Sequence, residues 1–546
     1  MKNPYFPLFA AFAALVLLAG CVASEPFPRL EKRGASLELM VDDAPYLILG
    51  GEVWNSASSS LDYMAPRWDA MQAVGINTVL LPLAWESIEP QEGVFDFTLL
   101  DGAILEARKR DMRIVLLWFG SWKNSMSCYA PCWVKESFGE RFELARTAEG
   151  RPLEIMSAFS ETNCEADRRA FVALMSHLKN EDLTRRVVMV QVENEIGMLQ
   201  SARDYSEAAN AAYRADVPRE VVDLLLTKGA ACHPRLYNAW QRMGAPMQGS
   251  WEVLFGAGID TEEFFQAYHY AKYVERIASA GREVYPLPLY ANAALNSRGR
   301  TAGAYPSAGP LPHLSDLWHL AAPTLDFLSP DIYDPLYPDW LAQYAACEPL
   351  LFIPEIQYEP SPTNGARAMY AVGEHRAIGF SPYAADDATP DSSIASAYPL
   401  LQMIWPLLQE ARSEERTYGL WFDRDNRERI LRVGDIELVC RHDLTLGWSP
   451  EARDESLWSE TGAVVVDLGD GEFLVAGTGV VITLRSADAT DGRTIGIAAI
   501  DEVVDLTPEG SLRYGRRLNG DEDHQGRHLR IPFGEYGAQH LRTYSY

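Results

Sequence analysis

The sequence predicts a (β/α)8 barrel (TIM barrel) followed by a C-terminal antiparallel β-sandwich domain, and three observations support this α/β fold class. From Pro45 to Arg412, short apolar runs alternate with longer amphipathic stretches, as expected for βα units around a parallel sheet. The apolar runs are nearly continuous, which suits strands buried on both faces. From Tyr418 onward, short strands separated by turn signals replace this alternation.

The first twenty residues are predicted to be a targeting segment rather than part of the fold. Their apolar run, residues 6–19, is short for a transmembrane helix. It ends at Leu18-Ala19-Gly20-Cys21, which resembles a bacterial lipobox and makes Cys21 the candidate lipidation site. Residues 21–40 would then be a tether, and the protein would be exported and held at an outer membrane by its lipid. The alternative is a plain secretory signal that happens to end at a cysteine.

Residues 41–414 are predicted to form the catalytic barrel. Apolar residues recur at helical spacing in Phe97–Arg110 and Asp167–Leu178, and a helix at Leu401–Arg412 closes the barrel. Eight apolar runs supply its strands: Tyr46–Gly50, Thr78–Pro82, Arg113–Trp118, Val187–Val192, Leu287–Ala291, Phe327–Ser329, Leu350–Pro354 and Ala377–Phe380.

The interval from Leu199 to Gly281 is much longer than one crossover needs. We predict an elaborated loop there that walls a pocket above the strand tips. Its predicted helices are Ala202–Tyr213, Glu220–Thr227 and Thr261–Ala280.

Residues 415–546 are predicted to form the separate β domain. The segment Asp467-Leu468-Gly469-Asp470-Gly471 reads as a hairpin connection between two of its strands. The predicted strands are Ile430–Val433, Ile436–Cys440, Ala463–Asp467, Glu472–Ala476, Val480–Arg485 and Gly496–Ile500.

Composition limits the partners of the protein. A formal net charge of −28 argues against nucleic acid and anionic membrane surfaces, since both attract basic patches. Beyond Cys21, six cysteines allow 15 disulfide pairings, and the sequence does not choose among them. Cys128 and Cys132 could pair locally, or join Cys164 in a zinc cluster, although neither spacing nor a nearby histidine supports the metal.

Two glutamates at the carboxyl ends of predicted strands carry the chemistry. Glu195 follows the fourth strand and Glu355 follows the seventh, and barrel enzymes place their catalytic groups at these tips. Two carboxyl groups about 5–5.5 Å apart are what retaining glycoside hydrolysis requires. We assign Glu195 as the acid/base and Glu355 as the nucleophile, whose charge raises the pKa of its partner.

The residues before Glu195 refine this prediction. Asn194 is the candidate ligand for the sugar 2-hydroxyl, whereas Glu193 is interpreted as a supporting residue. In a regular strand, Glu193 and Glu195 would share one face and Asn194 would lie on the other. Asn194 and Glu195 can therefore share a pocket only if the chain leaves strand geometry at the tip.

Several motifs resemble glycoside hydrolase family 35, the β-galactosidases of a clan with acid and nucleophile on strands four and seven. The likeness covers roughly residues 40–410 and is closest to a bacterial lipoprotein branch with an appended β domain. It rests on these segments: Gly50-Gly51-Glu52, Trp85-Glu86-Ser87-Ile88-Glu89-Pro90, Leu117-Trp118-Phe119-Gly120-Ser121-Trp122-Lys123-Asn124, Val190-Gln191-Val192-Glu193-Asn194-Glu195 and Phe352-Ile353-Pro354-Glu355.

The resemblance implies a galactose pocket at the strand tips. Tyr333 matches the family tyrosine that hydrogen-bonds the nucleophile. The alternatives are that the two tryptophans only pack loops, that Glu86 lies in a solvated turn, and that Tyr333 is a core aromatic. The remaining positions expected around the sugar are Glu52, Asn55, Trp85, Glu86, Trp122, Asn194 and Asn292.

The leading hypothesis is a retaining exo-β-galactosidase, with xyloglucan-derived fragments as a substrate suggested by family likeness. One alternative is another retaining glycosidase of the clan, a β-glucuronidase or arabinosidase, with Lys123 as the candidate partner of a uronic acid. The other is a glycan-binding lipoprotein without chemistry. No metal-binding, phosphate-binding or serine-hydrolase motif is present, and the proposed reaction needs no metal or cofactor.

Overall fold

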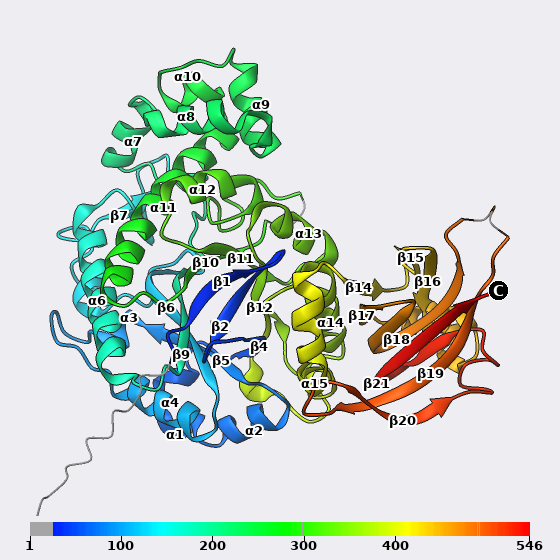
Figure 1. Cartoon of the computed structure of the whole chain (residues 1–546). Helices are drawn as coiled ribbons and strands as arrows, with labels where there is room; N and C mark the ends of the chain where they lie inside the picture. The colour runs from blue at the N-terminus through cyan, green and yellow to red at the C-terminus, as the bar shows by residue number, and fades with distance from the viewer. Residues whose placement is uncertain (1–25, 297–298, 489, 491) are drawn as a thin grey trace, which may run out of the picture.

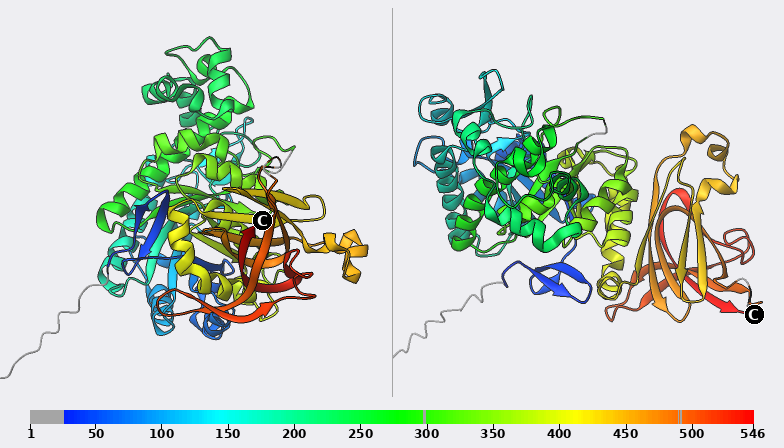
Figure 2. Two further views of the ribbon diagram at one scale, coloured as in Figure 1. Left: turned by 45° about the vertical axis from the view of Figure 1, so that its right-hand side comes forward. Right: turned by 90° about the horizontal axis from the view of Figure 1, so that it is seen from above.

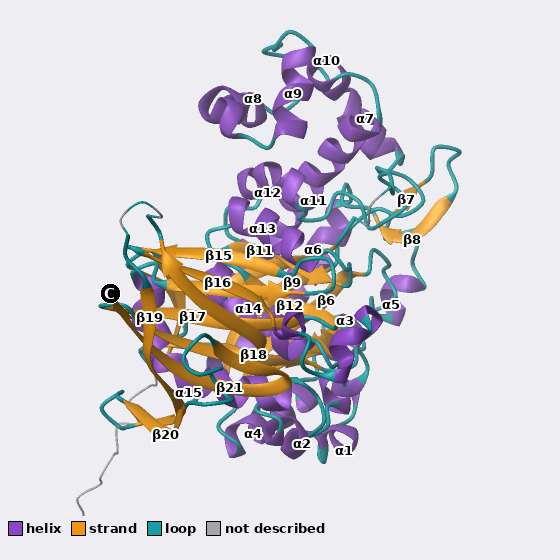
Figure 3. Cartoon of the chain, turned by 90° about the vertical axis from the view of Figure 1, so that its right-hand side faces the viewer, coloured by secondary structure: helices purple, strands orange, loops and turns teal. Residues whose placement is uncertain are grey.

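The computed structural model describes residues 26–296, 299–488, 490 and 492–546, and it contains a closed barrel and a separate β domain (Figure 1). The barrel strands follow the order β4-β5-β6-β9-β10-β11-β12-β13, all parallel, and β13 closes onto β4. Figure 3 shows the strands of the antiparallel domain next to the barrel. The predicted fold class is confirmed.

Each of the eight predicted apolar runs overlaps one barrel strand, and four of them begin two residues before it. Strands buried on both faces need apolar side chains throughout. Several strands continue beyond the predicted run toward their carboxyl ends, and these extensions carry the polar residues of the site. The bounds are β4 (Ile48–Glu52), β5 (Thr78–Ala84), β6 (Arg113–Lys123), β9 (Val187–Asn194), β10 (Leu289–Ala294), β11 (Phe327–Ile332), β12 (Phe352–Tyr358) and β13 (Gly379–Tyr383).

Helices surround the barrel, and the predicted helices at 97–110, 167–178 and 401–412 are confirmed by α4, α6 and α15. A short β7–β8 hairpin (Leu144–Arg146 and Pro152–Met156) lies between α5 and α6. The helices are α1 (Leu61–Met64), α2 (Arg67–Ala73), α3 (Trp85–Ile88), α4 (Thr98–Lys109), α5 (Cys132–Lys135), α6 (Glu161–Glu181), α11 (Ile259–Val284), α12 (Ser315–Ala321), α13 (Tyr337–Cys347), α14 (Asn364–His375) and α15 (Ile394–Ser413).

The long insertion forms a helical lobe that stands away from the barrel, at the top of Figure 1. Its first helix begins at Glu207 rather than at the predicted Ala202, because the side chain of Ser206 caps the helix by accepting a hydrogen bond from the backbone N–H of Ala209. The lobe consists of α7 (Glu207–Arg214), α8 (Arg219–Lys228), α9 (Pro234–Arg242) and α10 (Trp251–Phe255).

The residues predicted to be a tether include a small sheet, which corrects the prediction for 29–40. Strands β1 (Arg29–Arg33), β2 (Ser36–Val41) and β3 (Ala44–Pro45) pair antiparallel. Leu39 and Val41 join the apolar cluster of the barrel interior. The sheet therefore packs against that interior, and its short alternation of polar and apolar residues reflects one exposed face.

The C-terminal domain is an antiparallel sheet that curves around its own apolar core. The predicted strands Glu472–Ala476 and Val480–Arg485 are one long strand, β18, and the predicted hairpin joins β17 to it. The strands are β14 (Thr417–Phe422), β15 (Glu428–Val433), β16 (Ile436–His442), β17 (Thr461–Gly469), β18 (Glu472–Ser486), β19 (Ile495–Leu506), β20 (Leu512–Leu518) and β21 (Leu529–Ser545).

Figure 2 shows this domain beside α14 and α15, at the flank of the barrel. The six cysteines beyond Cys21 are free thiols, so the local pair considered for Cys128 and Cys132 is not formed. In the described part of the chain, no helix has the length and apolar character needed to span a membrane. Cys21 and the predicted targeting segment lie outside the described residues.

Candidate active site

Glu195 and Glu355 meet at the carboxyl end of the barrel. Glu355 lies within β12, and Glu195 directly follows β9. Carboxylate oxygens of these two residues and of Asp331 lie within 4.8 Å of one another. This separation fits a retaining pair and is too short for the water that an inverting pair must accommodate.

The chain leaves strand geometry at the tip of β9, as the predicted shared pocket requires. Glu193 and Glu195 have positive φ angles of 65° and 46°, in the left-handed region that non-glycine residues rarely adopt. Glu193 turns toward β6 and accepts hydrogen bonds from the backbone N–H groups of Trp122 (2.8 Å) and Ser121 (3.3 Å). Its predicted supporting position is therefore confirmed.

The surroundings of Glu195 suit a carboxyl group that alternates between acid and base. Burial, followed by the negative charge of Glu355, raises the pKa of Glu195 to about 7. Lys123 opposes this rise by its charge, and Asn124 opposes it by donating a hydrogen bond to Glu195. The result is a group that is protonated in part of the molecules near neutral pH.

Glu355 is held by a hydroxyl group on the neighbouring strand. The hydroxyl of Tyr333 donates to Oε1 of Glu355 over 2.6 Å, which confirms the predicted partner. Glu52, at the end of β4, lies close enough to Glu355 for the charges of the two carboxyl groups to interact. Burial, and then the charge of Glu355, raise the pKa of Glu52 well above its ordinary value, so Glu52 is poised to stay protonated.

Asp331 is a site residue that the sequence analysis did not identify. The strand register places it beside Glu355, and Nδ2 of Asn292 donates to its Oδ2 over 2.5 Å. Burial and the charges of Glu355 and Glu195 raise its pKa well above its ordinary value. Its position at the carboxyl end of β11, two residues before Tyr333, was the signal that could have revealed it.

Asn292 contacts Glu195 and Asp331 rather than lining open space. Its Oδ1 accepts the backbone N–H of Glu195 over 2.9 Å, while its Nδ2 binds Asp331. The side chain is buried. Asn292 therefore links strands five and six to the tip of strand four, and fixes the position of Glu195.

Lys123 supplies a positive charge among four carboxyl groups. Its Nζ lies 3.9 Å from Oε2 of Glu195. Desolvation favours neutral Lys123, but the negative charges of Glu355, Glu195, Glu52 and Asp331 outweigh it and raise the pKa of the ammonium group. The carboxylates of Glu195, Asp331 and Glu355 are close enough to share a metal ion. Lys123 already provides a cation for them.

Several buried polar atoms at the site have no hydrogen-bond partner among the described residues. Both side-chain atoms of Asn194 belong to this group, although the residue is fully buried. Oε1 of Glu52, Oε2 of Glu355 and Oδ1 of Asp331 belong to it as well. Buried polar groups are normally paired, so this convergence is what a site for a hydroxyl-rich ligand requires.

Two of the predicted sugar contacts pack in the core instead. Trp85 is fully buried and its indole N–H donates to Glu89 over 2.8 Å. Trp122 is also fully buried, with its N–H directed to the carbonyl of Met156 and its ring against Tyr270 and Tyr273. An indole at a strand tip can fill a loop core as well as bind a sugar, and here the loops cover both rings.

Glu86 and Asn55 lie toward the edge of the site. Glu86 is partly exposed and lies 3.4 Å from Nζ of Lys135. Asn55 is half-buried, follows β4, and contacts the hydroxyl of Tyr383 through its backbone. The structure thus brings together Glu52, Asn194, Glu195, Asn292, Tyr333 and Glu355, but not Trp85 and Trp122.

Two sequence families match parts of the chain. Residues 54–220 match a β-galactosidase family, glycoside hydrolase family 42. Residues 394–530 match a domain of unknown function, DUF5597, which covers α15 and most of the β domain.

Individual proteins give more distant matches. A β-galactosidase of Xanthomonas manihotis is 27% identical over 225 residues, which are 40% of this chain and 33% of that protein. β-Galactosidase BgaA of Clostridium cellulovorans is 23% identical over 202 residues, 35% of this chain and 29% of the relative. The chain thus spans about a third of the length of the curated relatives it matches. The crystal structure of a β-galactosidase from Marinomonas ef1 has 17% identity and a TM-score of 0.45, over 67% of this chain and 61% of that chain.

The matched family is 42 rather than the predicted family 35. Two of the motifs that suggested family 35 lie at the tips of strands four and seven, where any enzyme of this barrel type with two catalytic glutamates needs similar residues. The other three lie at the ends of strands one, two and three. Together with the two curated relatives, the match indicates a glycoside hydrolase related to the β-galactosidases of family 42.

Proposed function

We propose that the protein is a retaining exo-β-galactosidase that releases terminal galactose from oligosaccharide side chains by a double displacement. The observation that carries this proposal is the pair Glu195 and Glu355, with carboxylate oxygens within 4.8 Å at the tips of strands four and seven. The match of residues 54–220 to a β-galactosidase family supports the sugar.

In the first step, a carboxylate oxygen of Glu355 attacks the anomeric carbon while Glu195 donates its proton to the departing glycosidic oxygen. A glycosyl ester on Glu355 results, and the leaving group departs as an alcohol. In the second step, Glu195 takes a proton from water, the water oxygen attacks the anomeric carbon, and the ester bond to Glu355 breaks. The anomeric configuration is retained because it inverts twice.

The other residues support these steps. Tyr333 donates to Glu355, which keeps one oxygen oriented and leaves Oε2 for the anomeric carbon. Asn194 has both side-chain atoms available for the sugar 2-hydroxyl, where contacts strengthen in the transition state. Asn124 donates a hydrogen bond to Glu195, which stabilises the carboxylate once it has lost its proton.

The charge of the site argues against a uronic acid substrate. Four carboxyl groups surround one ammonium group, and Lys123 is already paired with them. A substrate carboxylate would have to compete with Glu195 and the other three carboxyl groups for the charge of Lys123, so we favour a neutral sugar over a β-glucuronide. The alternatives that remain are an arabinosidase and a glycan-binding protein without turnover.

The test is the variant Glu355→Gly with added azide. Azide would occupy the space of the lost carboxylate and attack from the same face, so a β-galactoside would give the α-galactosyl azide. Glu195→Ala should instead give the β-galactosyl azide. Full turnover of nitrophenyl β-galactoside by Glu355→Gly without azide would refute the assignment. Faster release of nitrophenol from the β-glucuronide, α-arabinoside or β-glucoside than from the β-galactoside would refute galactose as the preferred sugar.

Export and anchoring through a lipid on Cys21 stay part of this proposal, on the strength of the lipobox-like Leu18-Ala19-Gly20-Cys21. Incorporation of labelled palmitate into the wild type but not into Cys21→Ala would support it. Equal labelling of both proteins, or labelling of neither, would contradict it. Xyloglucan-derived fragments stay the suggested natural substrate.

A further inference from the structure

A large cavity opens on one side of the catalytic pair. It has a volume of about 790 Å³ and includes Glu195 and Asp331 in its wall. Its lining also includes Leu295, Arg300, Tyr305, Asp334 and Leu336. Tyr333 lines the cavity too, and its hydroxyl donates to Glu355. This volume lies in the upper part of the range of about 300–1,000 Å³ typical of ligand pockets.

The position of the acid decides what this cavity can hold. In the proposed reaction, Glu195 protonates the glycosidic oxygen, so the leaving group must lie on the side of Glu195. The cavity lies on this side, bounded by strands three to six, whereas Glu52 and Glu355 come from strands one and seven. We infer that the cavity is a leaving-group subsite that takes a neutral oligosaccharide of two or more sugar units. The inference rests on the proposed function.

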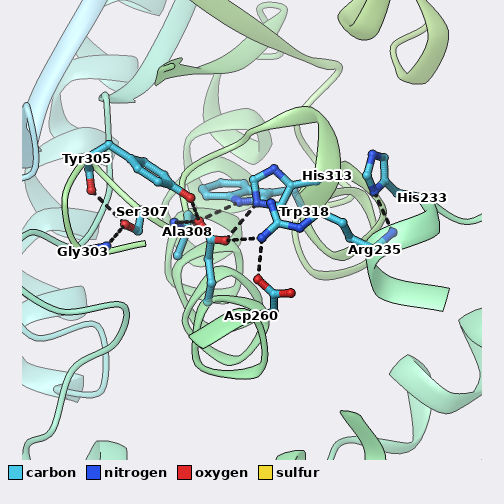
Figure 4. A network of polar contacts seen from close by, with 10 residues as sticks. His233, Arg235, Asp260, Gly303, Tyr305, Ser307, Ala308, His313 and Trp318 are labelled. Carbon is cyan, nitrogen blue, oxygen red and sulfur yellow. Dashed lines mark hydrogen bonds and ion pairs between the residues drawn. The ribbon is translucent and has the colours of Figure 1, made fainter. Parts of the chain in front are cut away.

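The loop that carries Tyr305 is fixed in place by a buried carboxylate on α11. Glu263 is fully buried and accepts hydrogen bonds from the hydroxyl of Tyr305 (2.6 Å) and the backbone N–H of Ala308 (3.3 Å). His313 lies 3.0 Å from the other oxygen of Glu263. Figure 4 shows Tyr305, Ala308 and His313, the three partners of this carboxylate, close together.

The same loop is also tied to the segment that follows Glu195. Met198 and Ser307 exchange two backbone hydrogen bonds of 2.8 and 3.0 Å, and Gln200 donates to the carbonyl of Gly303 over 2.8 Å. Backbone hydrogen bonds therefore connect the wall of the cavity to the segment that carries the acid/base. A subsite fixed in advance loses less entropy when a ligand binds, which favours a specific occupant.

The helical lobe was predicted to supply the pocket walls, and this prediction is wrong for this cavity. Its walls come from the ends of strands and from loops after β10 and β11, and none of its lining residues lies in α7–α10. The lobe contributes indirectly: Arg235 of α9 pairs with Asp260 over 2.6 Å and lies 3.8 Å from Glu263. The lobe thus braces the carboxylate that holds Tyr305.

The walls suit a neutral saccharide. Leu295, Leu336 and the ring of Tyr305 offer apolar surface for sugar ring faces, whereas Arg300 and Asp334 offer a donor and an acceptor for hydroxyl groups. An anionic leaving group would meet Asp334 and the partly ionised Glu195, and Arg300 is the one lysine or arginine that lines the cavity among the described residues. Charge therefore disfavours acidic saccharides.

The experiment measures kcat/KM for nitrophenyl β-galactoside and for β-galactosyl oligosaccharides with leaving groups of one, two and three sugar units. In the wild type, we expect kcat/KM for the oligosaccharides to rise by about tenfold from one unit to two, because remote contacts stabilise the transition state. In Arg300→Ala and Leu336→Asp, the ratio of the two-unit substrate to nitrophenyl β-galactoside should fall by about tenfold.

Arg219→Ala, which removes an exposed arginine on α8, is the matched control and should keep the wild-type ratio. Tyr305→Phe tests the wall itself, and should lower the same ratio because the loop loses its bond to Glu263. A wild-type kcat/KM that does not increase with leaving-group length, or variants that change both substrates equally, would overturn the inference. Failure of the wild type to release nitrophenol at all would instead refute the proposed function.

Discussion

The protein buries carboxylates at two neighbouring places, and their surroundings differ in almost every respect. Glu263 is a single acid surrounded by donors: Tyr305, Ala308, His313 and, farther away, Arg235. The catalytic cluster contains four acids around one lysine, with buried oxygen atoms that lack protein partners. Both oxygen atoms of Glu263 thus have protein partners, whereas several carboxylate oxygen atoms of the cluster have none among the described residues.

The pKa values reflect this difference. Burial favours the neutral form of Glu263, but hydrogen bonds from His313 and Tyr305 and the charge of Arg235 outweigh it and lower its pKa. In the cluster, burial and like charges act together, and the pKa values of Glu52, Glu195 and Asp331 rise. A carboxylate whose oxygen atoms all have protein donors stabilises the fold. A carboxylate with unpaired oxygen atoms is available for substrate hydroxyls and for proton transfer.

The largest expected effect is that of Glu195→Gln on turnover. Because the amide cannot donate a proton to the leaving oxygen, kcat/KM for substrates with poor leaving groups should fall by about 10²–10⁴-fold. Dinitrophenyl β-galactoside, whose leaving group needs little protonation, should be affected much less in its first step. Steady-state rates with both substrates test this, and an equal loss for the two would contradict an acid role.

The pH profile gives an independent test of the same residue. The wild type needs protonated Glu195, whose pKa is raised to about 7, so kcat/KM should decline as the pH rises through about 7. In Glu195→Gln this alkaline decline should disappear. A decline that persists unchanged in the variant would assign it to another group.

The next effect concerns stability and the contrasting site. Glu263→Gln leaves His313 and Arg235 without their buried partner, and should reduce the free energy of unfolding by about 3–5 kcal/mol. The lowered pKa means that Glu263 stabilises the fold above the pKa of the unfolded chain, about 4.3, and loses this contribution as the pH falls through the lower folded-state value. Denaturant unfolding at neutral and acidic pH measures the loss of stability and its pH dependence. If the difference in unfolding free energy between the wild type and the variant stayed constant down to low pH, it would contradict a contribution from the ionised Glu263.

The sequence predicted the barrel and the catalytic pair for one physical reason. Strands buried on both faces must be apolar, and polar residues that end such runs must meet at the carboxyl end of the barrel. Glu195 and Glu355 stood out in this way. Tyr333 was predicted as the hydrogen-bond partner of Glu355 only from the family resemblance. The observed hydrogen bond shows that a resemblance at a strand end can predict a neighbouring contact as well.

The other residues of the site are brought together by strand register and packing, which the order of apolar and polar residues in the sequence does not reveal. Lys123 reaches Glu195 because the pairing of β6 with β9 shifts register between Trp118 and Lys123. Asp331 enters because the register of β11 and β12 aligns it with Glu355. Trp85 was predicted to contact the sugar but lies in a loop core. An aromatic residue at a strand tip can occupy either position, and the sequence does not show which one the packing selects.

A smaller effect is expected when the cation of the cluster is removed. Burial and Glu355 raise the pKa of Glu195, and Lys123 acts against them. In Lys123→Met, the pKa of Glu195 should therefore rise further, and the alkaline decline of kcat/KM should move to higher pH. Lys135→Met, a change of a lysine at the edge of the site, is the control and should leave the decline in place. A shift to lower pH in Lys123→Met would mean that Lys123 does not stabilise the ionised acid.

The smallest effect, and the sharpest contrast with Glu263, is expected for the stability of Glu52→Gln. The raised pKa means that ionising Glu52 costs folded-state free energy, so the wild type should lose stability as the pH rises above the unfolded-state pKa of about 4.3. Glutamine cannot ionise, so the variant should gain Tm relative to the wild type between about pH 5 and about pH 8. Thermal unfolding across this range measures the gain. A loss at neutral pH, as expected for Glu263→Gln, would mean that both carboxylates hold structure and that the contrast between the two sites is wrong.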